Sequence, residues 1–147
     1  MNYNPEVTAS VLNKRAQGYF PAYMGIITEI VGPGYLRMLM AIKPEFIAPN
    51  TFLHAGTVVT LADTASGFAC MAHLPNGASG FTTIELKTNF LATARDGALL
   101  CEAQAVHLGR STHVWDATVK HVETNRTMAL FRCTQMILYP TQVRANS

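Results

Sequence analysis

One carboxylate, Asp63, stands in the middle of a long stretch that is apolar, small or hydroxylated almost throughout. The stretch covers residues 54–74 and contains no Lys, Arg or Glu. Its length and composition predict a buried helix, which Pro75 ends. An ionised carboxylate buried there without a partner costs several kcal/mol. Apolar surroundings raise its proton affinity, which suits a general base, whereas a purely structural Asp63 would be satisfied by neighbouring hydroxyls or amides.

The start of the same helix offers a second chemical group. The backbone N–H groups of Ala55, Gly56 and Thr57 have no partner inside the helix, and together with the helix dipole they favour a developing oxyanion. This combination suits the hydrolysis of an activated acyl group. Asp63 lies eight residues after Ala55, about 12 Å along the helix axis. One carbonyl cannot touch both groups in one chain, so a shared site predicts a two-fold dimer.

Other common catalytic arrangements find no support in the sequence. It contains no Gly-x-Ser-x-Gly motif, no P-loop and no dinucleotide fingerprint. Cys70 lies within the apolar helix without a His partner, and the three cysteines have neither metal-ligand spacing nor a disulfide pattern. We therefore expect no metal site. Three histidines fall on predicted strands, where we expect partial exposure: His107, His113 and His121.

The composition predicts one small domain with little surface charge. Of 147 residues, 49% are hydrophobic and 14% charged, with a net charge of +2. The small net charge gives no sign of nucleic-acid binding, while the scarcity of charge favours an oligomer. As a membrane span the stretch 54–74 fails, because Asp63 alone would add about 2.5–3.5 kcal/mol against insertion. Without a secretory signal or a disulfide pattern, we expect a cytoplasmic protein.

The remaining chain predicts the elements that position these groups. Asn4 and Pro5 are typical of a helix start and Gly18 of a helix end, which gives a flanking helix within residues 1–20. Runs 24–31 and 35–42 predict a hairpin, and four strands follow over 81–91, 99–108, 112–122 and 127–138. Short connections favour antiparallel neighbours for the last three. Residues 141–147 are expected to form a loose tail.

The order of these elements predicts an α+β fold in a single domain over residues 1–147. An antiparallel sheet of this size has one face to cover, and only the stretch 54–74 is apolar enough to cover it. The prediction is therefore an antiparallel sheet wrapped around one long central helix, with an extra N-terminal helix.

Three short motifs follow one another at a defined spacing: His54-Ala55-Gly56, Leu61-Ala62-Asp63 and Gly67. Residues 85–91, Glu-Leu-Lys-Thr-Asn-Phe-Leu, form a fourth. In combination they resemble the hotdog-fold acyl-CoA thioesterases of the phenylacetate-degradation type, over about residues 25–138. The resemblance implies hydrolysis of an acyl-CoA without a cofactor other than the CoA of the substrate. The expected partner is a second copy of the chain, with a dimer of dimers as the larger assembly.

The resemblance also implies a role for each motif position. Asp63 would be the base or nucleophile, and the N–H of Ala55 would donate to the thioester oxygen. His54 would orient the loop at the helix start, and Gly56 would allow the substrate to approach closely. Thr83 matches a position where the family has a hydroxyl that assists the attacking water.

The chain departs from the family pattern at three places: Ala55 stands for the first motif Gly, Ala92 stands where a Pro is usual, and a third departure lies in the loop before the helix. The family often has Asn six residues before the motif His, where this chain has Ala48. Asn50 could take that place if the loop is rearranged. Arg110, after Gly109 in a predicted turn, could meet the phosphates of CoA, although a solvated turn arginine is the simpler interpretation.

Two other functions stay open at this point. A hotdog hydratase or dehydratase acting on acyl-CoA or acyl-carrier protein would need a His beside an acid, and His54 near the partner's Asp63 could supply that pair. A non-catalytic acyl-CoA binder would tolerate the loss of Asn at Ala48.

Overall fold

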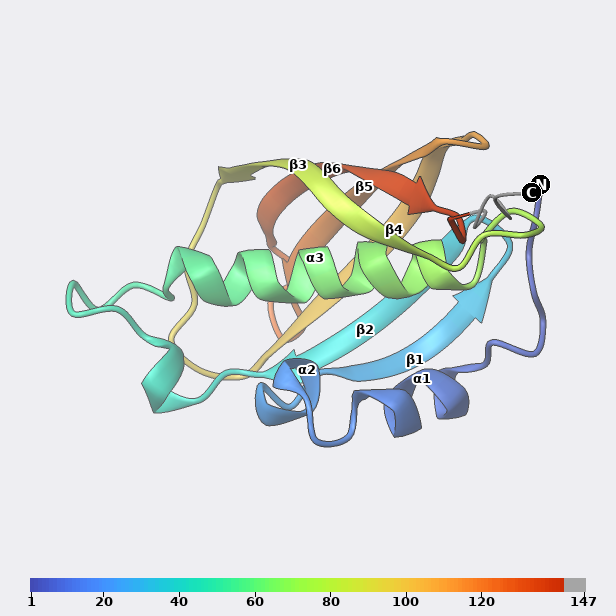
Figure 1. Cartoon of the computed structure of the whole chain (residues 1–147). Coiled ribbons are helices and arrows are strands. Elements are labelled where there is room, and N and C mark those ends of the chain that lie inside the picture. The colour runs from blue at the N-terminus through green and yellow to red at the C-terminus, as the bar shows by residue number, and fades with distance from the viewer. Residues whose placement is uncertain (142–147) are drawn as a thin grey trace, which may run out of the picture.

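The computed structural model describes residues 1–141, and it has the predicted architecture. A six-stranded antiparallel sheet curves around helix α3 (Ala55–Met71), which lies along its concave face (Figure 1). The predicted fold class is confirmed. The predicted tail lies outside the described residues from residue 142 on. The strands are β1 (Ile27–Gly32), β2 (Tyr35–Ala41), β3 (Gly80–Phe90), β4 (Ala98–Leu108), β5 (Thr112–His121) and β6 (Thr127–Leu138).

The order of the strands in the sheet is β1-β2-β4-β5-β6-β3. The hairpin β1–β2 and the neighbours β4–β5–β6 pair antiparallel, as their short connections predict. Strand β3 does not pair with the next strand in the chain, because the connection 91–97 carries the chain across the sheet to β4. It pairs instead with β6 and forms one edge of the sheet. Its outer backbone edge is therefore unpaired in the described part of the chain.

Small residues bring α3 close to the sheet. Leu61, Ala62, Ala65 and Ala69 are fully buried in the core beneath it. Because three of these four side chains are single methyl groups, the helix backbone can approach the strands, and the sheet bends around it. No helix within residues 1–141 is long and apolar enough to cross a membrane.

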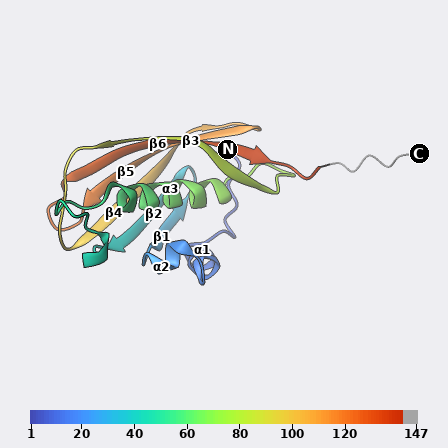
Figure 2. The ribbon, with the colours of Figure 1, turned by 60° about the vertical axis from the view of Figure 1, so that its left-hand side comes forward.

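The N-terminal segment differs in detail from the prediction. Helix α1 (Ala9–Ala16) begins after Thr8, whose Oγ1 accepts a hydrogen bond from the N–H of Val11. Asn4 does not cap this helix; its Oδ1 accepts from the N–H of Glu6 in a preceding turn. A hydroxyl nearer the apolar run thus supplies the cap. A short helix α2 (Phe20–Tyr23) follows, and Figure 2 shows both helices beside β1, at the edge opposite β3.

Candidate active site

Asp63 lies in the middle of α3, where the helix faces strand β3. Its carboxylate is half-buried, whereas the apolar stretch predicted full burial. The difference arises because β3 is the edge strand, and within residues 1–141 no further strand lies beyond it. Thr83 Oγ1 donates a hydrogen bond to Asp63 Oδ1 over 3.2 Å. Burial raises the pKa of the Asp63 carboxyl above its ordinary value, and the Thr83 hydroxyl opposes the shift.

The structure therefore brings Asp63 and Thr83 together, as expected for two groups of one site. Thr83 holds one carboxylate oxygen and leaves Oδ2 free to accept a proton. A half-buried carboxylate with a raised pKa, fixed by one neutral donor, can act as a general base near neutral pH.

The helix start is ordered by its own cap. His54 is the N-cap residue, and its Nδ1 accepts a hydrogen bond from the N–H of Gly56 over 2.9 Å. The neutral imidazole then carries its proton on Nε2. A Cβ on Gly56 would lie 3.0 Å from that Nδ1, so a side chain there would disturb the cap. Glycine at this position serves the His54 cap within the chain.

This cap leaves the N–H of Ala55 without a hydrogen-bond partner in residues 1–141. The N–H of Gly56 bonds to His54, and that of Thr57 bonds to the His54 carbonyl. Ala55 is exposed, and its N–H has no acceptor within residues 1–141. One outward-directed amide at the positive end of a 17-residue helix is a donor for an oxyanion.

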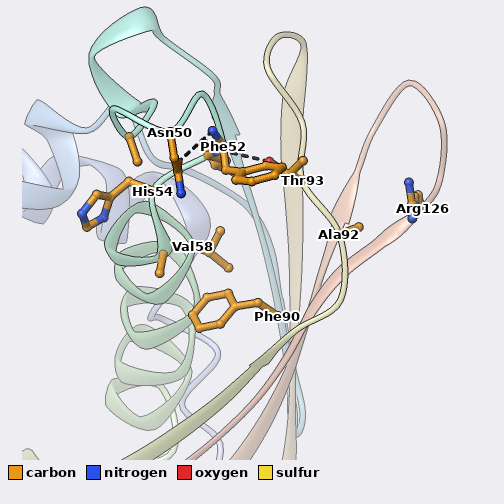
Figure 3. A pocket seen from close by; sticks show the side chains of 11 residues that line it. Asn50, Phe52, His54, Val58, Phe90, Ala92, Thr93 and Arg126 are labelled. Carbon is orange, nitrogen blue, oxygen red and sulfur yellow. Dashed lines mark hydrogen bonds between the residues drawn. The ribbon is translucent and has the colours of Figure 1, made fainter.

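A cavity of about 670 Å³ opens beside this helix start. Its wall is mostly apolar, and Figure 3 shows Val58 of α3 and Phe90 of β3 on facing sides. Arg126 reaches the cavity from the β5–β6 connection, and no carboxylate lines it. Arg95 stacks on Phe52 at 5.8 Å from the ring centroid. The cavity thus combines aromatic walls with one lining cation, Arg126, and a second cation packed against its Phe52 ring. This is a suitable chemistry for a long apolar chain that ends in phosphates.

The loop before the helix places Asn50 on this cavity, next to Ala48. Asn50 Oδ1 accepts a hydrogen bond from the N–H of Phe52 over 3.1 Å, one of the bonds drawn in Figure 3. Its amide NH₂ group makes no hydrogen bond within residues 1–141. Asn50 therefore lines the cavity with a free amide donor, two residues after Ala48, which is the position that matches the motif.

Arg110 is not brought to the cavity. It lies in the β4–β5 connection, at the other end of β5 from Arg126, and its guanidinium packs 5.8 Å from the ring centroid of Tyr139. The cation that lines the cavity at the helix start is Arg126. Sequence reasoning missed it because nothing local connects the β5–β6 turn to residues 50–58.

The expected exposure of the strand histidines is wrong for two of the three. His113 is fully buried and His121 is 7% exposed, whereas His107 is exposed. The period-two pattern of β5 could have indicated that His113 is buried, because it puts His113 on the same inner face as Trp115.

His113 also gives Cys70 the partner that no motif indicated, with 3.3 Å between Nδ1 and Sγ. Burial raises the pKa of Cys70 to about 12 and lowers that of His113 to about 4. Both groups are therefore neutral, which excludes a thiolate–imidazolium pair. Among residues 1–141, no three His, Cys, Asp or Glu side chains gather as metal ligands.

Comparison with known proteins identifies the class of this chain. The family described as Thioesterase superfamily matches residues 50–129. A structure of a mutant of thioesterase PA1618 from Pseudomonas aeruginosa superposes with a TM-score of 0.87, at 25% identity, over 94% of this chain and 99% of that one. Thioesterase HI1161 from Haemophilus influenzae gives a TM-score of 0.88 at 23% identity, over 98% and 99%.

Two curated relatives agree with this class. The 1,4-dihydroxy-2-naphthoyl-CoA hydrolase of Escherichia coli is 26% identical over 141 residues, covering 94% of this chain and 100% of that protein. The proofreading thioesterase EntH of Klebsiella pneumoniae is 27% identical over 119 residues, covering 81% and 86%. The chain belongs to the thioesterase superfamily. It is a thioester hydrolase with the hotdog fold, as its motifs indicated.

Proposed function

We propose that this protein hydrolyses acyl-CoA thioesters at a site shared by two chains, with Asp63 of one chain as the base. The observation that carries the proposal is the half-buried Asp63 carboxylate, held by Thr83, on the same helix as the unpartnered N–H of Ala55. About 12 Å of helix separates the two groups, too far for one thioester carbon. A second chain in antiparallel orientation would bring its own helix start to this Asp63.

The edge strand β3 supports the pairing of two chains. Leu86 and Phe90 lie opposite Cys133 and Ala129, which are buried on the concave face, yet they are 41% and 48% exposed. Apolar side chains on the inner face of an unpaired edge strand are expected to be covered. A second copy that pairs along β3 covers them and sets the two α3 helices side by side. Exposed apolar residues on the outer face, such as Leu130 and Met136, suit the pairing of such dimers into a dimer of dimers.

In the proposed reaction Asp63 Oδ2 takes a proton from a water molecule whose oxygen attacks the thioester carbon. The Ala55 N–H of the second chain donates to the oxygen that becomes negative. Collapse of this intermediate re-forms the carbonyl and breaks the C–S bond, and the CoA thiolate takes the proton from Asp63. His54 fixes the helix start through its cap, and Thr83 keeps Oδ1 occupied so that Oδ2 faces the water.

The cavity at the helix start is the proposed site for the CoA part of the substrate. Phe52 and Phe90 suit the pantetheine chain, and Arg126 suits a phosphate. The free amide of Asn50 would donate to the substrate in place of the residue absent at Ala48. All three cysteines are free and buried, which suits the reducing cytoplasm.

The test is thiol release from short, medium, branched and aromatic acyl-CoAs. Wild type should release thiol from at least one class, and Asp63→Asn should lose about 10²–10⁴-fold in kcat. Asp116→Asn is the matched control, since Asp116 lies on the outer face in an exposed pair with Arg132. Formation or loss of enoyl absorbance without thiol release would indicate a hydratase or dehydratase. A rise in melting temperature with acyl-CoA but no turnover would indicate a binder.

A further inference from the structure

A row of polar side chains leads from the active site into the interior. Thr83 on β3, Gln135 on β6 and His113 on β5 are direct neighbours across the three strands. Apolar residues would be expected at such inner positions beneath a buried helix. Gln135 and His113 are nevertheless fully buried polar residues in the middle of the sheet.

Each member of this row faces one position of α3. Thr83 bonds to Asp63, and His113 contacts Cys70. Between them, Gln135 Nε2 lies 3.9 Å from the place where a Cβ on Gly67 would stand. Helix positions 63, 67 and 70 are spaced four and three residues apart and share one face. The helix therefore presents a carboxylate, a glycine without a side chain and a thiol to the three polar residues below it.

Gln135 has no hydrogen-bond partner for either end of its amide within residues 1–141, and His113 Nε2 also has none. Leaving a buried donor or acceptor unsatisfied costs about 1–3 kcal/mol for each group, whereas an apolar side chain of the same shape removes that cost. The Gln135 amide therefore has a free donor and a free acceptor, and it lies opposite a residue without a side chain. A buried water molecule satisfies groups of this kind in protein interiors.

We propose that Gln135 holds an internal water molecule between Gly67 and Thr83, and that this water orients the Thr83 hydroxyl toward Asp63. Directly opposed residues of two strands have Cβ atoms about 5 Å apart, a span that one water can bridge between the amide and the hydroxyl. The water donates to Thr83 Oγ1, whose own proton goes to Asp63 Oδ1. Gln135 is thus a positioning residue for the base, and this role rests on the proposed function.

Phe81 closes the same place from the edge of the sheet. Its ring Cζ lies 3.1 Å from the position of a Cβ on Gly67. The ring therefore separates the proposed water from solvent and from the exposed side of β3, and an acyl group that enters near Asp63 need not displace it.

The direct test is a crystal structure of the ligand-free protein in which ordered waters are resolved. We expect one water within hydrogen-bond distance of both the Gln135 amide and Thr83 Oγ1. A Gln135 amide bonded only to protein groups, with no water beside it, would overturn the proposal. This measurement does not depend on activity, so it also decides the matter if no acyl-CoA is hydrolysed and the proposed function fails.

The kinetic test replaces Gln135 by Met, which keeps the shape and removes the polar atoms. We expect kcat to fall about tenfold with KM unchanged, the effect of about one lost hydrogen bond in the transition state. Gln135→Asn, which can hold the water through a shorter amide, should recover part of kcat. Gln104→Met makes the same chemical change at an exposed position of β4 and should leave kcat unchanged.

Two results would contradict the positioning role. If the Gln135→Met protein had a raised melting temperature and an unchanged kcat, the Gln135 amide would bind no water and would contribute to no step of the reaction. If KM increased only for acyl groups that carry a hydroxyl, Gln135 would bind the substrate hydroxyl and not a water molecule.

Discussion

The single chain surrounds the two chemical groups of the proposed site, Asp63 and the Ala55 N–H, in different ways. Around Asp63 the chain supplies the helix, the facing strand and the Thr83 hydrogen bond. Around Ala55 it supplies an exposed amide beside an open cavity. The position of the base is therefore fixed by packing within one chain, while the oxyanion donor opens onto a cavity and has no acceptor within residues 1–141. This contrast is what a site completed by a second chain predicts.

At the helix start, the largest effect is expected from removing the Ala55 N–H, second only to the loss of the Asp63 carboxylate. Ala55→Pro does this cleanly, because proline is favoured at the first helical position and His54, with ψ near 132°, already has the extended backbone required before proline. Loss of one oxyanion donor should lower kcat by about 10²–10³-fold. Thiol release at saturating acyl-CoA measures it.

Mixing this variant with Asp63→Asn tests whether the two groups come from different chains. After joint refolding, about half the dimers are mixed and each holds one intact site, so activity should return to about a quarter of wild type. If both groups of one chain served one site, mixing would restore nothing.

The next largest effect is expected at the edge strand. Leu86→Lys places a charge on the inner face of β3 and should block pairing. The chain should stay folded, since Leu86 is already half-exposed, but it should elute as a monomer and lose most of its thiol release. Leu130→Lys is the matched control on the outer face of β6, where only a dimer of dimers would be affected. A fully active Leu86→Lys monomer would refute the shared site.

A smaller effect, on KM for acyl-CoA, is expected at Arg126 and none at Arg110. Arg126→Gln should raise KM for acyl-CoA about tenfold, the loss of about one charge-assisted hydrogen bond to phosphate, with kcat unchanged. KM for the same acyl group on N-acetylcysteamine, which has no phosphate, should not change. Arg110→Gln should behave as wild type on both substrates; if it alone raised KM for acyl-CoA, the cavity at the helix start would not hold the phosphates.

The smallest effect concerns stability. Burial raises the pKa of Asp63 above its ordinary value of 3.8, so the folded chain holds that proton more tightly than the unfolded chain. Asp63 therefore lowers stability at neutral pH, and the cost vanishes below pH 3.8, where both states are protonated. Asp63→Asn should raise Tm at pH 7, and the gain should shrink as the pH falls toward 3.8. A gain independent of pH would contradict this origin.

Sequence reasoning succeeded where the chemistry was local. The buried helix, its start at His54 and the position of Asp63 follow from one continuous pattern. The helix ends at Met71, however, and the expected end at Pro75 is wrong because a turn at residues 72–73 precedes the proline. It was less successful where side chains from distant segments meet. Arg126 and Gln135 looked like an ordinary turn residue and an ordinary strand residue.

The sequence by itself determined that one helix carries both a carboxylate and a free amide, about 12 Å apart, because the rise of a helix is fixed by its local hydrogen bonds. Only the tertiary structure decided that β3 lies at the edge of the sheet, beside β6. Strand pairing depends on contacts between segments far apart in the chain, and the alternating patterns of the last four strands are too alike to specify their order. That order places Thr83 against Asp63, lines up Gln135 and His113 behind it, and leaves the edge that a second chain would cover.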